Sequence, residues 1–319
     1  MDYQAGDLRI VGNNYYVQNK RDFQGFGNIS LEDKSECFEF AYNMTYAQKG
    51  AHRDSRSGGE LHRTKGQIFI NTFQGKLAEF ALYRYLKECY IDVDKPDLEE
   101  YELGKWDSFD LDCQGKHFSV KSTKSYGDLL LLETKDWNEK GEYIPNISAG
   151  TSKYDYTVLV RFKPDGESLM KKHSLLYQKE KEIPANIKEI LEEIICKQDW
   201  TYDFPGFIYH SELVGMIHER RIIPKNAMLN GSTQMDAENY YFQTGNMHAM
   251  LELFTQSGNG SAVVEDDLLL KRKCPYCGRK LVVRRGHNRF WGCEGYFAIP
   301  SCRYTEPMKG RYIKSNVFF

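Results

Sequence analysis

The chain has 319 residues, of which 41% are hydrophobic and 14% aromatic. This composition excludes a disordered protein, and the length suits one large domain with a smaller one beside it. No run approaches the 18 apolar residues of a membrane span, and the first ten residues show no signal segment, so we expect a cytoplasmic protein. Net charge is −2, but residues 270–319 hold 12 Lys and Arg against two Asp and Glu, a local net of +10. This asymmetry indicates a basic module attached to a larger, acidic body.

The first 30 residues show no clear period, and the first predicted helix follows them. Ser30 is a candidate N-cap, and apolar residues recur at helical spacing up to about Gln48. A polar, basic loop covers residues 50–67, where Arg53 and Arg56 are candidate phosphate contacts. A plain solvated loop explains the same composition equally well.

A second helix is predicted over residues 70–88, because Leu77, Phe80, Ala81 and Tyr85 recur at helical spacing. Glu79 interrupts the apolar pattern of this helix. An acidic residue on a helix is usually a solvated charge, so Glu79 alone indicates no site.

The stretch that organises the chain is residues 106–125, WDSFDLDCQGKHFSVKSTKS. Alternating residues predict two strands joined by a turn at Gln114 and Gly115, which sets Cys113 opposite Lys116 and Asp112 opposite His117. One face of this hairpin then carries the polar residues Asp110, Asp112, His117, Ser119 and Lys121, and the other carries Phe109, Leu111, Phe118 and Val120. Two carboxylates and a lysine on one face suit a hard cation and a polarised phosphate. A solvent-facing hairpin is the alternative.

The elements after the hairpin complete a mixed fold. Buried strands are predicted over residues 128–134 and 154–162, an edge strand over 207–209, and helices over 186–197 and 211–218. Residues 223–262 look irregular, with Asn and Gln that are able to read adenine or simply face solvent. The fold class that these elements predict is α/β, with an α+β mixed sheet flanked by helices.

The hairpin residues resemble the PD-(D/E)xK nuclease superfamily, whose pattern is an Asp on one strand and an acid, any residue and Lys on the next. Asp110 and Lys121 match that pattern, and Ser119 departs from it by replacing a carboxylate. The segment QGKLAEFALYRYL resembles the family helix that supplies a further acid, at Glu79. The resemblance implies a restriction-endonuclease-like fold and a magnesium ion held by Asp110, Glu79 and the carbonyl of Val120. Lys121 then orients the attacking water or stabilises charge, and Ser119 holds a metal-bound water; Asp112 and Glu133 are reserve ligands.

Four of the eight cysteines form a second motif. Cys37, Cys89, Cys113 and Cys196 lie in apolar patterns and are expected to be reduced core residues. Two, 15 and eight residues separate Cys274, Cys277, Cys293 and Cys302, the spacing of a closed four-thiolate zinc site. Such a site is structural, because it leaves no open coordination position. We therefore predict a boundary between residues 1–265 and a zinc finger over residues 266–319.

The segments CPYCG, LVVRR, FWGC and SCRYT of this module resemble the C4 zinc finger at the C-terminus of bacterial type IA topoisomerases. The resemblance implies nucleic-acid binding. Basic residues interleaved with aromatic ones agree with it, and the candidate DNA contacts in this module are Arg284, Arg285, Arg289 and Trp291.

Together the two modules predict a magnesium-dependent endonuclease that cuts double-stranded DNA, most like a type II restriction enzyme. A homodimer and a separate cognate DNA methyltransferase are the expected partners. Two alternatives stay open. One is a DNA-binding protein with a degenerate, inactive nuclease fold, which Ser119 favours, and the other is a structure-specific repair nuclease.

Overall fold

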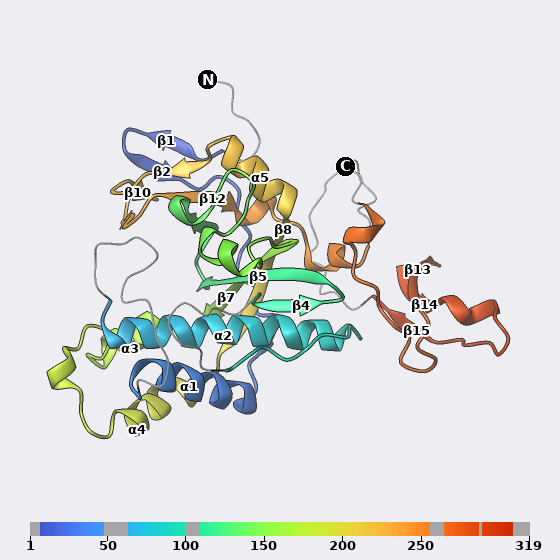
Figure 1. Ribbon diagram of the computed structural model, residues 1–319, viewed down its shortest axis with the longest axis horizontal. Helices are drawn as coiled ribbons and strands as arrows, with labels where there is room; N and C mark the ends of the chain where they lie inside the picture. The colour runs from blue at the N-terminus through green and yellow to red at the C-terminus, as the bar shows by residue number, and fades with distance from the viewer. Residues whose placement is uncertain (1–6, 48–62, 100–108, 256–264, 287–288, 309–319) are drawn as a thin grey trace.

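The computed structural model describes residues 7–47, 63–99, 109–255, 265–286 and 289–308 (Figure 1). Ser30 begins the first helix as predicted, because its Oγ accepts a hydrogen bond from the backbone N–H of Asp33 at 3.0 Å. The second helix starts at Lys65, earlier than expected, where Thr64 and Gln67 form a capping box. The α-helices are α1 (Leu31–Thr45), α2 (Lys65–Glu88), α3 (Gly166–Lys172), α4 (Ile187–Leu191) and α5 (His210–His218).

A five-stranded sheet forms the centre of the body, in the order β3-β8-β7-β5-β4. Strands β5 and β7 are parallel, whereas the other neighbours are antiparallel, so the sheet is mixed. The strands are β3 (Gly27–Asn28), β4 (Leu111–Cys113), β5 (Lys116–Lys124), β7 (Tyr156–Lys163) and β8 (Thr201–Tyr209).

Both faces of the central sheet are covered. Phe118 and Val158 point into the hydrophobic cluster that includes Leu77 of α2, and Figure 1 shows α1 and α2 stacked below the sheet. Leu159 and Ile208 point the other way, into a cluster with residues of β6, β12 and α5. Strands buried on both faces read as near-continuous apolar runs, which is why β7 was predictable from YDYTVLVRF.

Two smaller sheets lie on the side of the central sheet away from α1 and α2, together with α5, and the sequence did not predict most of them (Figure 1). One has the order β6-β12-β9 and the other β1-β2-β10-β11. The strands are β1 (Arg9–Val11), β2 (Asn14–Tyr16), β6 (Leu129–Glu133), β9 (Ile222–Ile223), β10 (Met228–Leu229), β11 (Thr233–Gln234) and β12 (Asn239–Gln243). The expectation of irregular structure over residues 223–262 is therefore wrong for the described part. Strands of two or three residues are too short to show a period.

Two further predictions differ from the structure. The segment 207–209 is not an edge strand, because β8 is longer and lies between β3 and β7. Pro205, which lacks an N–H, sits where the β7–β8 register shifts, and this bulge hid the strand in the sequence. The helix expected over residues 186–197 is α4 followed by a π-helical turn, Glu192–Cys196.

The C-terminal module is a three-stranded antiparallel sheet of β13 (Leu281–Arg285), β14 (Arg289–Cys293) and β15 (Thr305–Pro307). Figure 1 shows it at the right, beside the turn between β4 and β5. Its residues Leu281 and Trp291 belong to the same hydrophobic cluster as Leu111 and Phe254 of the body. The module therefore packs against the body through an apolar contact.

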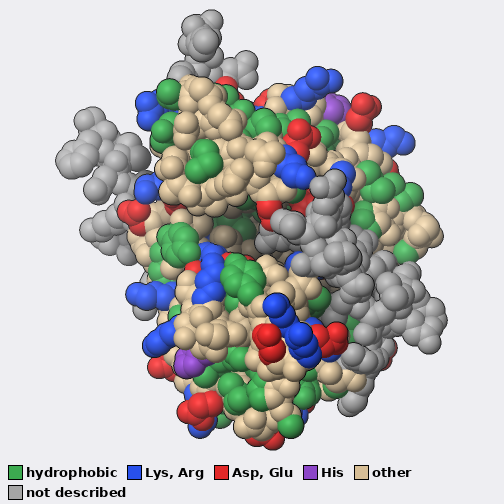
Figure 2. All heavy atoms as spheres, turned by 90° about the vertical axis from the view of Figure 1, so that its left-hand side faces the viewer, with side chains coloured by type: hydrophobic (Ala, Val, Ile, Leu, Met, Phe, Trp, Pro, Cys, Tyr) green, Lys and Arg blue, Asp and Glu red, His purple; other side chains and the backbone are tan. Residues whose placement is uncertain are grey.

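The structure confirms a mixed α/β architecture with a cysteine-containing C-terminal module, while the restriction-endonuclease-like fold stays a prediction. Figure 2 shows the face at the left of Figure 1, which is hollowed between the part carrying β1, β2 and β10 and the helices below. None of the helices within the described ranges is long and apolar enough to span a bilayer.

Candidate catalytic hairpin and zinc finger

The predicted hairpin forms with the predicted register. Asp112 lies opposite His117, and Cys113 lies opposite Lys116. Gln114 and Gly115 form the turn with φ values of 56° and 71°, as a two-residue turn with both central residues in the left-handed region requires. The hairpin thus brings the residues before Leu111 next to the middle of β5.

Asp110 and Lys121 lie together at this point. The Oδ2 atom of Asp110 is 4.0 Å from Nζ of Lys121, and it accepts a hydrogen bond from the backbone N–H of Val120 at 2.6 Å. Both side chains are partly exposed, at 27% and 36%. Asp110 is therefore held by a backbone donor with its carboxylate beside a lysine and open to solvent on one side.

Ser119 lies on β5 two residues before Lys121 and is fully buried. Within the described parts of the chain its Oγ has no hydrogen-bond partner. Tyr154 is a close neighbour of the site that the sequence gave no reason to single out: burial raises the pKa of its hydroxyl, and the charge of Asp110 raises that pKa further. A buried hydroxyl without a partner is uncommon and fits a place where a water or ligand atom belongs.

The polar face also carries His117, whose Nε2 is 3.2 Å from a carboxylate oxygen of Asp112. Phe109 stacks on the His117 ring, with 3.5 Å between ring centroids. The expectation that Phe109 shares the core face with Leu111 is therefore wrong. Strand β4 begins only at Leu111, so its alternation does not extend back to Phe109. Glu133, the other reserve acid, pairs with Lys135 at 3.2 Å.

Glu79 is buried on α2 with a cationic partner. Its Oε2 lies 2.9 Å from Nζ of Lys76, and the two side chains are 11% and 8% exposed. Its charge also contributes to raising the pKa of Cys37 on α1, after the larger effect of burial. Nζ of Lys76 lies 5.1 Å from the ring centroid of Phe40 on α1, so the pair is packed beside α1. Its role as a ligand beside Asp110 stays a prediction.

The described side chains supply few carboxylates for a magnesium ion at the hairpin. No cluster of three or more His, Cys, Asp or Glu ligand atoms occurs around Asp110 in the described residues. Magnesium usually keeps several waters and takes one or two carboxylates from the protein. Asp110 alone offers one carboxylate here, so a magnesium ion at this position would keep most of its waters.

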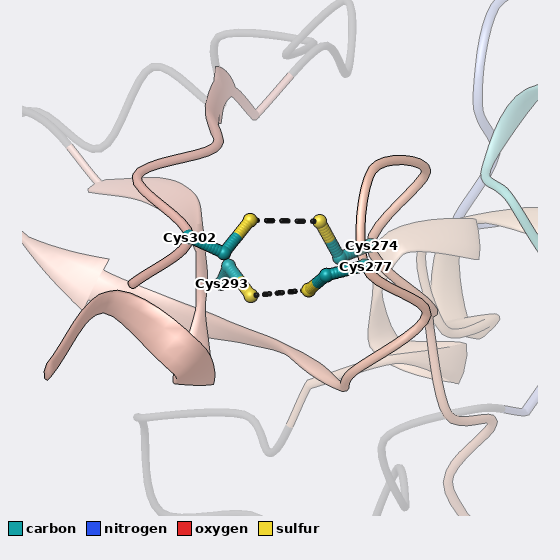
Figure 3. Close-up of side chains that lie close together, drawn as sticks. All are labelled: Cys274, Cys277, Cys293 and Cys302. Carbon is teal, nitrogen blue, oxygen red and sulfur yellow. Dashed lines mark hydrogen bonds between the residues drawn. The ribbon is translucent and has the colours of Figure 1, made fainter. Parts of the chain in front are cut away.

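The four C-terminal cysteines converge as the spacing predicted (Figure 3). Their Sγ atoms all lie within 4.8 Å of one another, with 3.6 Å between Cys274 and Cys302 and 3.4 Å between Cys277 and Cys293. Zinc–sulfur bonds of about 2.3 Å in a tetrahedron place the sulfurs about 3.8 Å apart. The cluster therefore fits a zinc ion, and none of the four cysteines forms a disulfide.

Backbone donors and burial act in opposite directions on the thiols of this cluster. A hydrogen bond from the backbone of Arg279 lowers the pKa of Cys277 to about 7. Burial raises the pKa of Cys293 to about 12, although the N–H of Gly295 points at its Sγ at 3.3 Å, and burial also raises the pKa of Cys274. Since zinc binds the thiolate, metal binding must displace protons from the buried thiols. The other cysteines, Cys37, Cys89, Cys113 and Cys196, are free and wholly or partly buried, as expected.

The predicted DNA-contacting residues differ in how far their side chains are exposed to solvent. Arg289 is exposed on β14. Arg284 packs across Gly292, and its guanidinium lies 5.8 Å from the ring of Tyr296. Trp291 is only 3% exposed, so its burial gives the ring a packing role in place of base stacking. Arg285 ends β13, and the side chain of Arg285 and the whole of Arg53 and Arg56 lie outside what the structure describes.

Sequence reasoning missed the residues that join the finger to the hairpin. Gln114 exchanges two hydrogen bonds with the backbone of Lys271, and Arg272 is a buried cation between the modules. The sequence marks Gln114 only as a turn residue and Arg272 only as one of the 12 Lys and Arg in residues 270–319. No local pattern marks either residue, because both contacts join segments more than 150 positions apart.

Comparison with known proteins supports the class of the C-terminal module. Residues 271–311 match the family model of the topoisomerase DNA-binding C4 zinc finger. This segment is accordingly a topoisomerase-type zinc finger, and its cysteine cluster supports structural zinc.

The particular relative found is DNA topoisomerase 1 of Methanocaldococcus jannaschii, 42% identical over 43 residues. The match covers 13% of this chain and 5% of the topoisomerase, so it concerns the finger alone. No solved structure matches the chain.

Proposed function

We propose that the protein is a magnesium-dependent endonuclease that cuts double-stranded DNA, of the PD-(D/E)xK type and specifically a type II restriction enzyme. One observation carries the proposal: Asp110 and Lys121 adjoin on a hairpin in the same chain as a DNA-binding zinc finger. A carboxylate and a lysine at 4.0 Å suit a phosphodiester centre, and the finger supplies affinity for its substrate.

Asp110, Glu79 and the carbonyl of Val120 would hold the magnesium ion. When bound, the ion supplies polarisation of the scissile phosphate and lowers the pKa of a water. Lys121 stabilises the charge that develops on the phosphate oxygens, and Ser119 holds a water by its hydroxyl. In the reaction the oxygen of water forms a bond to phosphorus and one phosphorus–oxygen ester bond breaks. The water loses a proton to solvent, and the departing alkoxide gains one.

The burial of Glu79 supports its place in this proposal. A buried ion pair such as Lys76–Glu79 is often replaceable by apolar residues without loss of stability. Fold stability alone therefore does not explain why a buried acid occupies position 79. Burial beside a cation is the reason for choosing Glu79 as the second acid, ahead of Asp112, whose side chain is 55% exposed.

A double-strand break needs two such sites or two sequential visits by one site, and we propose the simplest arrangement, a homodimer acting on a palindromic target. A separate DNA methyltransferase would protect the host sequence. One protein chain per duplex in light scattering of the DNA complex would contradict the dimer.

The test is cleavage of plasmid DNA with magnesium by wild type, Asp110→Asn and Lys121→Met, with Asp112→Asn as the matched control. Asparagine at position 110 keeps an oxygen for the N–H of Val120 while removing the charge. We expect both site variants to lose at least a hundredfold in rate with unchanged DNA affinity, and the control to keep its rate. Cutting by Asp110→Asn at nearly the wild-type rate would refute the assignment. Discrete bands would support a restriction enzyme, and a smear a repair nuclease.

Ser119 favours a second candidate, a DNA-binding protein with a nuclease-like body that does not cut. The residue replaces a family carboxylate and is fully buried. In that case the wild type leaves plasmid DNA intact with magnesium or manganese while still binding it.

A further inference from the structure

Arg272 lies at the centre of the contact between the finger and the body. It is 5% exposed, and its Nε donates to the backbone carbonyl of Cys89 at 2.7 Å. Its guanidinium pairs with Glu306 of β15 and lies 4.5 Å from the ring centroid of Trp291. Cys89 is the C-cap of α2, the helix that carries Glu79. One side chain therefore joins two strands of the finger to the end of that helix.

Gln114 makes a second connection at the turn of the hairpin. Its Nε2 donates to the carbonyl of Lys271 at 2.9 Å, and its Oε1 accepts from the N–H of Lys271 at the same distance. This reciprocal pair resembles one rung of an antiparallel sheet. It ties the turn between β4 and β5 to the residue directly before Arg272.

The surroundings of Arg272 are apolar, whereas the hydrogen bonds between Gln114 and Lys271 are exposed to solvent. Trp291 packs edge-on against Phe254, with ring centroids 6.4 Å apart. Leu270 donates its backbone N–H to the carbonyl of Leu253 at 2.8 Å, so the chain enters the finger while still hydrogen-bonded to the body. A tethered module would show neither a shared apolar cluster nor backbone hydrogen bonds across the boundary.

We propose that the zinc finger is a brace for the hairpin, and that Gln114 and Arg272 are positioning residues that transmit its fold to Asp110 and Glu79. This inference rests on the proposed function only in calling those two acids catalytic. The brace fixes the hairpin turn and the C-terminal end of α2 against one rigid unit. Loss of zinc therefore loosens the hairpin as well as the finger, and the position of finger-bound DNA relative to Asp110 is fixed.

The distance along the hairpin from Gln114 to Asp110 is short enough for such coupling. The three residues of β4 separate Asp110 from Gln114, and the four steps along the chain span at most about 14 Å at the usual rise. Loss of the two hydrogen bonds between Gln114 and Lys271 should raise the equilibrium constant for local opening of the hairpin turn roughly tenfold, which corresponds to about 1.4 kcal/mol.

Hydrogen–deuterium exchange of the zinc-loaded full chain tests this coupling without any cleavage assay. In Gln114→Ala we expect peptides covering residues 111–120 to exchange about tenfold faster, while peptides covering Leu281–Cys293 keep their protection. In Arg272→Met the end of α2 should lose protection, and Arg272→Lys should not restore it because lysine lacks the planar fork. Gln234→Ala, an exposed glutamine on β11, is the matched control and should change neither region.

Zinc removal by a chelator gives the second arm. In wild type it should accelerate exchange in residues 111–120 about tenfold, and in Gln114→Ala it should add less than twofold there. The brace would be overturned if exchange in residues 111–120 were unchanged both by zinc removal from wild type and by the Gln114→Ala substitution. If chelation unfolds the whole chain, the zinc-loaded Gln114→Ala comparison alone decides.

Cleavage kinetics give a reading separate from exchange. Gln114→Ala should lower kcat with little change in the Kd for DNA, because the finger surface is intact. If the wild type does not cut DNA, the proposed function is refuted, but the exchange experiment still tests the brace. Conversely, if the wild type cuts DNA but exchange in the hairpin does not respond to the finger, the proposed function is supported and the brace is refuted.

Discussion

Raising the pH from 6.5 to 9 should remove a stabilising charge at His248. Its Nε2 lies 2.9 Å from Glu212 and its Nδ1 3.0 Å from Glu252, so both ring nitrogens must donate and the ring is protonated. The other carboxylate oxygens are fixed as well, because Glu212 accepts from the N–H of Tyr209 and Glu252 from that of Ala249. The ring therefore ties α5 to the segment that leads into the finger.

The magnitude follows from the pKa of this histidine. Burial alone would lower the pKa of His248, but the hydrogen bonds and charges of Glu212 and Glu252 outweigh it and raise the pKa to about 9. In the unfolded chain the pKa is about 6.5. The stabilisation is complete below pH 6.5 and is lost as the pH rises through 9. The difference of about 2.5 units corresponds to about 3 kcal/mol, an upper value because the carboxylates are partly exposed.

The assay is urea unfolding of wild type and His248→Gln at pH 6.5 and pH 9. Other groups also titrate in this range, including His210, whose pKa is lowered by burial, so the comparison uses the difference between the two proteins. We expect wild type to lose about 2–3 kcal/mol more than the variant between the two pH values. Equal losses in both proteins would show that the imidazole is not held charged between the two acids.

Three other perturbations have defined outcomes. Asp203→Ala should lower the free energy of unfolding by about 3–5 kcal/mol, measured by urea unfolding, because it leaves the 1% exposed guanidinium of Arg161 without its carboxylate. Arg289→Gln should flatten the slope of log affinity against log salt by about 0.9 in DNA titrations, whereas a slope equal to wild type would mean that this exposed side chain contacts no phosphate. Ser119→Ala should lower the cleavage rate by less than about tenfold, since a hydroxyl that only holds a water contributes less than a charged ligand; a loss as large as that of Asp110→Asn would instead make the hydroxyl a principal catalytic group.

The sequence was most informative where a local rule fixes the geometry. The hairpin register followed from a two-residue turn and alternation, and the zinc cluster followed from cysteine spacing alone. The N-cap at Ser30 followed from hydrogen-bonding chemistry within one turn. Each of these features is decided by residues fewer than 30 positions apart.

The sequence was least informative where distant segments meet. The cluster at His248 joins residues 36 positions apart, and the contact of Gln114 with Lys271 spans 157. The short strands β9 to β11 are held by pairing with other segments and have too few residues for a period. Phe109 was assigned to the wrong face because alternation was extended beyond the strand that produces it.

The docking of the finger also changes how its charge should be counted. Residues 270–319 carry a net of +10, but this sum treats every cation as available to phosphate. Arg272 is buried and paired with Glu306, and Arg284 lies across Gly292. Neither can neutralise a phosphate without breaking the contacts that hold the finger in place. The number of cations left for phosphate is therefore smaller than the 12 Lys and Arg of this segment, and exposed cations such as Arg289 determine the salt dependence of DNA binding. The same basic segment thus has two physical roles, since part of its charge packs the finger against the body and the remainder is left for DNA.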